Sequence, residues 1–495
     1  LWGPRERFTL EGDVLVRLTG RRQTRWPLAR LRRFTLGVRR SPYAKPLRFV
    51  RLRFAGQDQT FVCGPDVADY AAFVSTLARA AAHAAPNVRF QAEGGRLAGL
   101  LIMTAALLGA GAVAMALTGG LAPNGKSALL AMQIWEKDIN AKGGLLGRPV
   151  KLVYYDDQSN PANAPGIYTK LLDVDHVDLL FGQATNISTP AMPTVIEHKV
   201  VFMDSFALAV NSHFHYSRFF QIAPFGPDGQ NALSQGFFEV ATTMKPKPKT
   251  VALVGADAEF AKSGLDGARA NAKRAGLKIV YDRTYPPSTV DFTPVVRAIQ
   301  ATHPDVLFIA SYPSDTTGML RAMHEIGLAP KMLGGDMIGP QNGSVKEALG
   351  EQLSGLVDFE FFVHEPTMRF PGIDAFLQKY QARARKEGLD PLGYYMPPFV
   401  YAATDILAQA VTAVGSLDQD KIAQYIHKTT FKTIVGDVKF GADGEWAEPR
   451  ILTIQYQNIK GHDLAQFTRP GTQVILYPPA FKTGKLEYPY SVVKR

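Results

Sequence analysis

The chain has 495 residues, and its 46% hydrophobic and 20% charged residues are ordinary proportions for folded globular domains, which excludes a disordered or fibrous protein. Its length predicts about two to four domains. The single cysteine, Cys63, excludes an intramolecular disulfide, and we interpret it as a small buried hydrophobic residue. The formal net charge of +11 lies entirely within residues 1–96, because the rest of the chain has as many acidic as basic residues.

The basic N-terminal part, residues 1–96, is predicted to be rich in β-strands. A helix over 67–84, capped by Asp66, is expected to follow them. The layout, together with the run GRRQTRWPLARLRRFTL, resembles a small bacterial PH-like domain ahead of a membrane helix. Its Arg-rich surface is interpreted as a solvated face beside a membrane, with lipid head groups or nucleic acid as alternative contacts. Alternating runs bounded by Gly and Pro predict the strands at 7–10, 13–18, 31–38, 47–54 and 59–63.

An uncharged apolar stretch, residues 97–118, separates this basic part from the rest of the chain. As a helix its 22 residues would extend ~33 Å, enough to cross a bilayer core of about 30 Å. The excess of positive charge before it predicts that residues 1–96 are cytoplasmic and that the C-terminal part is extracytoplasmic. The stretch is therefore predicted to be a transmembrane or signal-anchor helix in the inner membrane.

From residue 150 onward, apolar runs alternate with helical patterns of 10–15 residues, which is typical of βαβ units and a parallel sheet. The run KPKPK at 245–249 interrupts the alternation, and the same rhythm restarts after it. We therefore predict an α/β fold with two similar lobes that bind a ligand between them, beyond the carboxyl ends of the strands. The predicted strands are 151–155, 177–181, 200–203, 250–254, 278–281, 305–310, 331–333 and 356–361.

Five motifs in this part of the chain stand in the order of a known family: LTGGLAPNGKS, DINAKGGLLGRPV, LVYYDD, TYPPSTVDF and VGDVKFGADG. With them, residues 117–495 resemble the substrate-binding proteins of branched-chain amino acid ABC transporters, the Leu/Ile/Val-type members of the type I periplasmic binding proteins. The resemblance implies two Rossmann-like lobes joined by three crossovers. It places the first lobe at 117–243 and 363–433, and the second at 250–362 and 434–495.

The same resemblance requires a first strand just before LTGG, which only GAVAMAL at 111–117 can supply. Those residues are also needed to complete the 22-residue membrane span. If they form the strand, the apolar helix shrinks to 97–109, which is too short to span and resembles the apolar region of a signal peptide. The sequence leaves both alternatives open.

One further motif, GLAPNGKS at 120–127, satisfies the phosphate-loop pattern G-x-x-x-x-G-K-[ST]. Pro123 argues against a nucleotide site, because it removes a backbone N–H from a loop that would have to present such groups to phosphate. The residues around it already match the binding-protein family, in which this loop joins the first strand to the first helix.

The resemblance also implies which residues contact the ligand in the first lobe. Thr185 and Asn186 could equally be plain helix caps. Phe206 and Ala207 depart from the small residue and hydroxyl that the family usually has there, which argues against a branched-chain amino acid. The predicted contacts of the first lobe are Gln183, Ala184, Thr185, Asn186, Ser205, Phe206 and Ala207.

In the second lobe the resemblance implies contacts from Phe260, Tyr312 and Asp336. Asp336 falls where the family places the acid that meets a ligand ammonium, and its alternative is a solvated loop residue. Phe260 and Tyr312, with Phe206, favour a flat or aromatic ligand.

No nucleophile-plus-base motif appears, so we predict no enzymatic activity, no cofactor and no metal; the pair His213 and His215 has no third ligand nearby. The predicted function is capture of an amino acid or related small molecule by lobe closure, for the permease subunits of an ABC importer. Two alternatives remain: a binding protein for aromatic acids or amides, and a membrane-anchored ligand sensor.

Overall fold

The computed structural model describes residues 6–11, 14–19, 22–41, 44–54, 57–63, 77, 89–93 and 110–491. The chain divides into two compact units, each of which is made of more than one segment. The first comprises Leu1–Ala110, Glu136–Lys151 and Ala408–Asp418; the second comprises Gly111–Trp135, Leu152–Leu407 and Gln419–Arg495.

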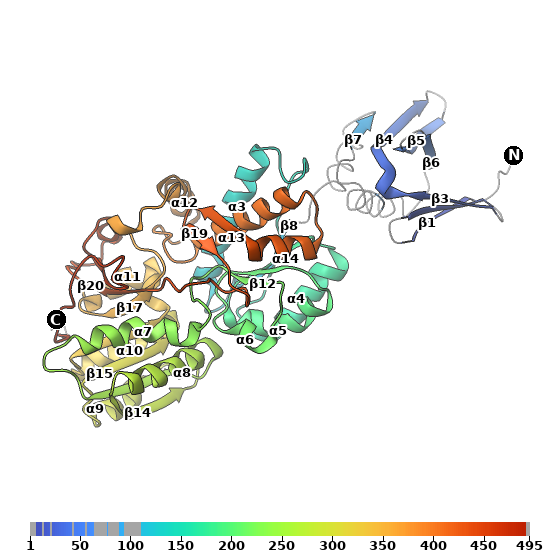
Figure 1. Ribbon diagram of the computed structural model, residues 1–495. Helices are drawn as coiled ribbons and strands as arrows, with labels where there is room; N and C mark the ends of the chain where they lie inside the picture. Colours follow the sequence, from blue (N-terminus) through green and yellow to red (C-terminus); the bar gives the residue numbers. More distant parts are fainter. Residues whose placement is uncertain are drawn as a thin grey trace. The chain divides into compact units, whose positions relative to one another are not determined.

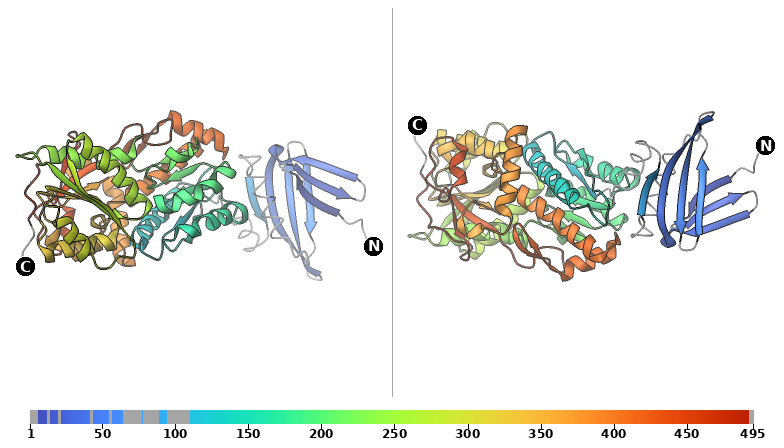
Figure 2. Two further views of the ribbon diagram at one scale, coloured as in Figure 1. Left: turned by 90° about the horizontal axis from the view of Figure 1, so that it is seen from below. Right: turned by 90° about the horizontal axis from the view of Figure 1, so that it is seen from above.

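The first unit contains two small sheets, which Figure 2 shows in blue. One is an antiparallel meander of β1 (Glu6–Glu11), β2 (Val14–Thr19) and β3 (Arg22–Pro27). The other has the order β6-β5-β4-β7, in which only the β4–β7 pair is parallel. Its strands are β4 (Leu31–Ser41), β5 (Ala44–Phe54), β6 (Gln57–Cys63) and β7 (Arg89–Glu93), and the short 3₁₀ helix η1 (Leu28–Arg30) precedes them.

All five strands predicted in this unit are confirmed, whereas β3 and β7 were not predicted. Their sequences, RQTRWP and RFQAE, lack the apolar alternation that marks a strand, so only pairing with a neighbour identifies them. The helix expected over 67–84 lies outside the described residues, apart from Leu77.

The prediction of one apolar helix over 97–118 is wrong, because Ala110–Met115 forms strand β8. The alternative, that 111–117 supplies the first strand, is confirmed: β8 lies between β9 (Val153–Asp156) and β10 (Leu179–Gly182) in a five-stranded sheet. A strand buried on both faces of a parallel sheet is as uniformly apolar as a membrane helix, which is why the two look alike in sequence. Residues 97–109 lie outside the described residues.

Across the described ranges, no single helix is long and apolar enough to cross a membrane. Helices α13 (Pro397–Val414) and α14 (Gln419–Lys428) are long and apolar enough only when they are counted together. The chain bends by 111° at the break between them.

The second unit contains the five-stranded sheet, in the order β12-β11-β10-β8-β9, and its β8–β9, β10–β11 and β11–β12 pairs are parallel. Its core joins residues of these strands to helices α4 and α5; Tyr168, Ile187 and Phe202, for example, are completely buried. The remaining strands are β9 (Val153–Asp156), β10 (Leu179–Gly182), β11 (Phe202–Asp204) and β12 (Phe219–Gln221). The helices between them are η2 (Pro161–Asn163), α4 (Ala164–Thr169), the π-helical turn η3 (Lys170–Val174), α5 (Thr185–Glu197) and α6 (Val210–Phe214).

A seven-stranded sheet, also in the second unit, has the order β14-β13-β15-β16-β17-β20-β21. Its first five strands are parallel, and β20 and β21 are antiparallel. Its strands are β13 (Thr250–Ala256), β14 (Lys278–Tyr285), β15 (Val306–Ser311), β16 (Met332–Met337), β17 (Val357–Glu360), β20 (Leu452–Tyr456) and β21 (Gln473–Tyr477).

Helices α7 (Gly229–Thr242) and α8 (Glu259–Arg274) pack on the strands of this sheet (Figure 1). Glycines let them pack closely. Gly264 of α8, for example, lies so near Asp336 of β16 that an added Cβ would stand 2.7 Å from its Oδ2. The other helices of this part are α9 (Thr293–Gln300), α10 (Pro313–Ile326), η4 (Gly339–Gln341), α11 (Gly343–Leu349) and η5 (Gly350–Leu353).

The chain passes between the two sheets three times. It does so first between β12 and β13 and last between the small hairpin β18–β19 and strand β20. The middle passage is fixed by Gln419 at the start of α14, whose side chain bonds to Val201 N (2.8 Å) and Asp178 O (3.2 Å) beside the five-stranded sheet. The remaining elements are α3 (Ala122–Ala141), η6 (Pro366–Met368), α12 (Ile373–Glu387), β18 (Thr430–Thr433), β19 (Gly436–Lys439) and η7 (Leu464–Thr468).

The predicted α/β fold with two largely parallel sheets is confirmed, and each of the eight strands predicted after residue 150 overlaps an observed one. Strands β12, β18, β19, β20 and β21 were not predicted. The last two are antiparallel additions that follow no βαβ unit, so the alternation of strands and helices does not mark them.

Candidate ligand-binding site

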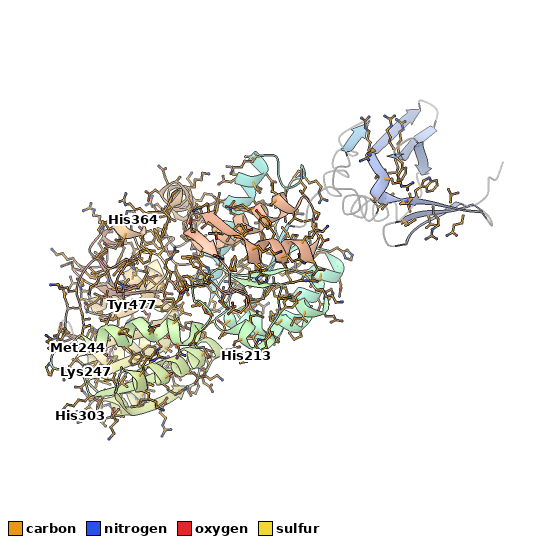
Figure 3. All side chains as sticks on the ribbon, viewed as in Figure 1. His213, Met244, Lys247, His303, His364 and Tyr477 are labelled. Carbon is orange, nitrogen blue, oxygen red and sulfur yellow. The ribbon has the colours of Figure 1, made fainter. Side chains whose placement is uncertain are left out.

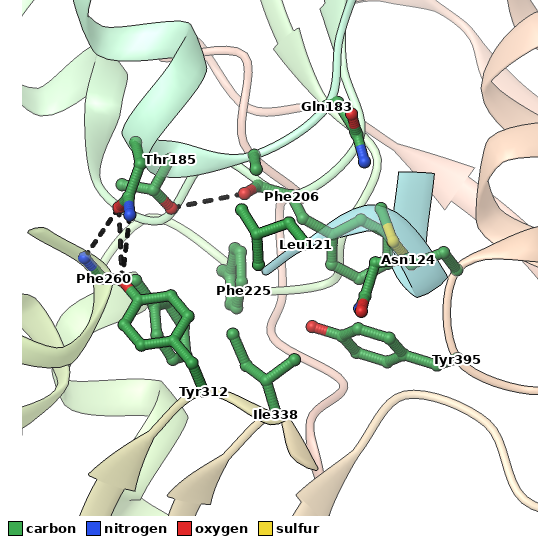
Figure 4. Close-up of a pocket in the computed structure, with 13 residues that line it drawn as sticks. Leu121, Asn124, Gln183, Thr185, Phe206, Phe225, Phe260, Tyr312, Ile338 and Tyr395 are labelled. Carbon is green, nitrogen blue, oxygen red and sulfur yellow. Dashed lines mark hydrogen bonds between the residues drawn. The ribbon is translucent and has the colours of Figure 1, made fainter. Parts of the chain in front are cut away.

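A cavity of about 40 Å³ lies where the carboxyl ends of strands from both sheets meet (Figure 4). Most of the lining comes from loops and helix starts that follow strands, which is where open α/β sheets bind ligands. The five-stranded sheet contributes residues after β8, β10, β11 and β12, and the seven-stranded sheet contributes residues after β13, β15 and β16. The lining residues are Leu121, Asn124, Gln183, Ala184, Thr185, Asn186, Phe206, Phe225, Phe260, Tyr312, Ile338, Tyr395 and Met396.

On the wall of the five-stranded sheet, hydrogen bonds hold the loop after β10 against its neighbours. Thr185 Oγ1 donates to Phe206 O (3.3 Å) and accepts from Leu208 N (3.0 Å). The Gln183 side-chain oxygen accepts from Ala116 N (2.9 Å) at the end of β8. These bonds fix the main chain of three adjacent strand ends, so this wall is preorganised.

Asn186, in the first turn of α5, joins this wall to the opposite one. Its Nδ2 donates to Tyr312 Oη (3.1 Å), and its Oδ1 accepts from Phe260 N (3.3 Å) (Figure 4). One turn further along α5, Thr189 Oγ1 donates to Glu259 Oε1 (2.7 Å). The two walls are therefore in direct contact in this conformation, which explains the small volume of the cavity.

Aromatic rings supply much of the lining. Phe206 lies 5.0 Å from Tyr395 and 5.2 Å from Phe361, measured between ring centroids. Phe260 and Tyr312 form an edge-to-face pair at 6.1 Å. Such ring walls favour a ligand with a flat or apolar body.

The polar groups of the lining are all neutral. Burial raises the pKa of Tyr312 to about 12, so its hydroxyl stays protonated at physiological pH. The Oδ1 of Asn124 is buried and has no hydrogen-bond partner, and Figure 4 shows this oxygen directed toward Tyr395. An unpaired buried acceptor is costly, so the site offers this oxygen to an N–H group of a ligand.

Seven of the ten predicted site residues line the cavity: Gln183, Ala184, Thr185, Asn186, Phe206, Phe260 and Tyr312. Ser205, Ala207 and Asp336 do not. Ser205 N donates to Gly182 O (3.1 Å), and Ala207 is completely buried. These two residues therefore form the support beneath Phe206 rather than the cavity surface.

Asp336 lies within β16, two residues before Ile338, and only 1% of it is exposed. Neither of its carboxylate oxygens has a hydrogen-bond partner, and burial raises its pKa well above the ordinary value. It contacts Gly264 of α8 instead of the cavity. Asp336 was expected to be either an acid in the pocket or a solvated loop residue. Both expectations are wrong, because the residue is buried within a strand.

Six lining residues were not predicted from the sequence: Leu121, Asn124, Phe225, Ile338, Tyr395 and Met396. Asn124, Phe225 and Ile338 share one signal that could have identified them, because each comes shortly after a strand whose carboxyl end faces the site. Tyr395 and Met396 precede α13 and follow no strand, so only the folded chain brings them here.

The structure agrees with rejecting a phosphate loop at 120–127. Helix α3 already begins at Ala122, and Lys126 is exposed rather than turned into the cavity. His213 and His215 are both exposed as well, and Figure 3 labels His213. Among the described residues, no three His, Cys, Asp or Glu side chains come together in a way that could hold a metal ion.

Two α/β sheets with a cavity between their carboxyl ends, joined by three passages of the chain, define a two-lobed binding protein. A family model for periplasmic binding proteins matches residues 112–457. The chain belongs to this family, as the motifs of the sequence indicate. The match begins within β8 and does not include residues 1–96. Their resemblance to a PH-like domain therefore stays a prediction.

Three similar proteins illustrate the family. A leucine-, isoleucine-, valine-, threonine- and alanine-binding protein from Pseudomonas aeruginosa is 23% identical over 339 residues, which are 68% of this chain and 86% of the relative. A branched-chain amino acid transporter substrate-binding protein from Streptococcus pneumoniae, solved in complex with isoleucine, has a TM-score of 0.60 at 20% identity, covering 70% of this chain and 96% of that one. A solute-binding protein from R. palustris, solved in complex with benzoate, has a TM-score of 0.60 at 17% identity, covering 74% and 94%.

Proposed function

We propose that this protein is the extracytoplasmic solute-binding component of an ABC importer, and that it captures an amino acid or a related small molecule by closure of two lobes around it. The proposed lobes are 117–243 with 363–433, and 250–362 with 434–495. The protein would deliver its ligand to permease subunits and carry out no chemical step itself.

The observation that carries this proposal is the bond between Asn186 and Tyr312 across the cavity. It links the loop after β10 to the loop after β15, so the two walls approach each other through side chains that also line the ligand cavity. Closure and ligand contact thus depend on the same residues, as a capture mechanism requires. The seven predicted residues that line the cavity are the proposed ligand contacts.

The charged groups of an amino acid ligand have proposed partners on the wall of the five-stranded sheet. The start of α5 carries the partial positive charge of a helix N-terminus, which favours a carboxylate, and Thr185 and Asn186 belong to its first turn. The amide oxygen of Asn124 could accept from an ammonium. Asp336 is 1% exposed and outside the lining, so it would meet an ammonium only if this wall rearranged.

A second candidate ligand class, aromatic acids or amides, is favoured by a specific observation. The lining contains five aromatic rings and no charged side chain, and the only nearby predicted acid, Asp336, is buried behind it. A planar ligand without an ammonium would need no acidic partner in such a site.

A thermal-shift screen of the full chain tests both candidate ligand classes, amino acids and aromatic acids or amides. The screen compares isoleucine, phenylalanine, benzoate, benzamide and ATP; a ligand at 100 times its dissociation constant should add about 2.7 kcal/mol to the free energy of unfolding. The Asn186→Ala variant should lose the shift, whereas Gln378→Ala, which removes an exposed amide on α12, should keep it. Stabilisation by amino acids supports the first ligand class, and stabilisation by benzoate or benzamide alone supports the second. The proposal is contradicted if only ATP stabilises the protein, or if none of the compounds does.

A further inference from the structure

A second cavity, of about 480 Å³, shares no lining residue with the first. Three segments form it: 209–217, which includes α6; 226–230, which leads into α7; and 442–445, which follows β19. The last two segments belong to passages of the chain between the two sheets. The cavity therefore lies at the connections about which the lobes would move.

The charged groups of this cavity are almost all acidic. Asp228, Asp443 and Glu445 line it together with His215, and its lining contains no Lys or Arg. A concave wall with carboxylates of one sign concentrates negative potential and attracts cations.

Glu445 is the group that most clearly lacks a partner. It is 7% exposed, and its Oε2 is buried with no hydrogen bond. Burial and the neighbouring acids Asp443 and Asp204 raise its pKa well above the ordinary value. A buried carboxylate without a cation or donor is costly, so a positive group placed in the cavity would be bound favourably.

The walls around Glu445 are held rigidly, as a binding site requires. Asn211 Nδ2 donates to Asp443 O (2.7 Å) and to Tyr216 O (3.1 Å), which ties α6 to the 442–445 segment. Gln221 N donates to Gly444 O (2.9 Å), and Asp443 Oδ1 accepts from Glu445 N (3.1 Å). The carboxylate is thus presented by a fixed main chain.

The arrangement suits an extended organic cation better than a metal ion. Within the described residues, these acids do not come close enough together to form a metal-ligand set, and the cavity is far larger than one ion. Asp228 lies on a different segment from Asp443 and Glu445, and the alkyl groups of Ala209, Pro227 and Ala442 line the space as well. Separated acids with apolar surface between them match amines joined by a methylene chain.

We propose that this cavity binds a linear alkyl diamine or polyamine, with one ammonium on Glu445 and Asp443 and another toward Asp228. The site is independent of the ligand cavity between the sheets. Bound there, the cation would link two of the three connections and so bias the movement of the lobes.

Isothermal titration of the full chain with putrescine and with spermidine tests this. We expect saturable binding of at least one of them, weakened tenfold or more by Glu445→Gln. The matched control is Glu448→Gln, which removes an exposed carboxylate three residues away and should leave the affinity unchanged. Asn186→Ala, at the first cavity, should also leave it unchanged.

Parallel titrations with Mg²⁺ at equal ionic strength separate a shaped site from a diffuse negative field. No saturable amine binding, unchanged affinity in Glu445→Gln, or displacement by equimolar Mg²⁺ would each overturn the proposal. If Glu445→Gln does not fold, as judged by circular dichroism, Asp228→Asn takes its place, because asparagine can still cap α7 while the charge is lost. Amine binding that survives Asp228→Asn then overturns the proposal in the same way.

Discussion

Asn186 and Tyr312 are 126 residues apart in the chain and meet across the cavity, where Asn186 Nδ2 donates to Tyr312 Oη at 3.1 Å. Asn186 lies in the first turn of α5, just after β10, and Tyr312 directly follows β15, so each side chain comes from the carboxyl end of a parallel strand, one in each sheet. The pair is thus both a part of the lining and a latch between the two walls.

Removing the Tyr312 hydroxyl should weaken ligand binding without unfolding the protein. In Tyr312→Phe the ring keeps its contact with Phe260, but Asn186 loses the hydroxyl that accepts from its Nδ2 and donates to its Oδ1. We expect a loss of about 0.5–1.5 kcal/mol in binding free energy, measured by titration calorimetry with the ligand found in the screen. Tyr154→Phe, at a side chain that is 39% exposed, is the control and should change nothing.

A double-mutant cycle isolates the latch itself. Because the two side chains bond directly to each other, Asn186→Ala combined with Tyr312→Phe should cost less than the sum of the single changes, by roughly 0.5 kcal/mol or more. Strict additivity would mean that the pair does not act as a unit in the closed state.

Phe206→Ala should destabilise the protein and broaden the range of ligands. The ring is 7% exposed and packs on Phe361, Tyr395 and Phe399, so its removal leaves a void that opens into the cavity. We expect the free energy of unfolding to fall by about 2–4 kcal/mol in urea titrations, and bulkier ligands to gain affinity relative to small ones. An unchanged ligand order would show that Phe206 does not limit the size of the ligand.

The protein should lose stability as the pH rises toward neutrality, because the buried carboxyl of Asp204 must then lose its proton. Burial raises the pKa of this completely buried carboxyl to about 7, against about 3.9 in an unfolded chain. Between these values the folded state binds more protons than the unfolded state, so the free energy of unfolding falls with rising pH. Asp204→Asn, which keeps an acceptor for Phe206 N, should flatten this dependence in melts from pH 4 to 7.

Part of the slope should survive in that variant. The pKa values of Asp157 and Glu360 are also raised by burial, to about 6 and about 7, and both act in the same direction. Glu448→Gln, at an exposed position, should reproduce the wild-type slope. A slope equally steep in Asp204→Asn and in the wild type would contradict the assignment.

Gly125→Ala should disturb the packing of α3 against the residue that follows β8. An added Cβ would lie 2.0 Å from the carbonyl oxygen of Ala116, so the helix or the strand must shift. We expect a loss of about 1–3 kcal/mol in thermal unfolding and weaker ligand binding, because Asn124 shifts as well. Gly120→Ala is the matched control, since nothing lies within 4 Å of its added Cβ. Equal stability of the two variants would contradict this packing.

Local patterns predicted the strands that repeat a βαβ rhythm, such as 250–254 and 305–310, because a strand buried in a parallel sheet needs a continuous apolar run. They failed for β3 and β7, which carry charged residues and exist through pairing with neighbours. They also failed for the membrane helix over 97–118, where β8 satisfies the same apolar composition between two partner strands.

The residues of the candidate site also divide into those that the sequence predicted and those that it did not. The motifs of the sequence led to the loops after β10, β11, β13 and β15, and the structure brings Asn186, Phe206, Phe260 and Tyr312 together there. They gave no indication of Tyr395, which reaches the cavity from the start of α13.

By itself the sequence determined the class of fold and the family, because apolar periodicity and ordered motifs are local properties of the chain. Only the tertiary structure decided that Ala110–Met115 is a strand, that Asp336 is buried behind the lining and that Glu445 faces a second cavity. The physical reason is that burial, pairing and the direction of a side chain depend on residues far away in the sequence. Those partners exist only once the sheets have formed.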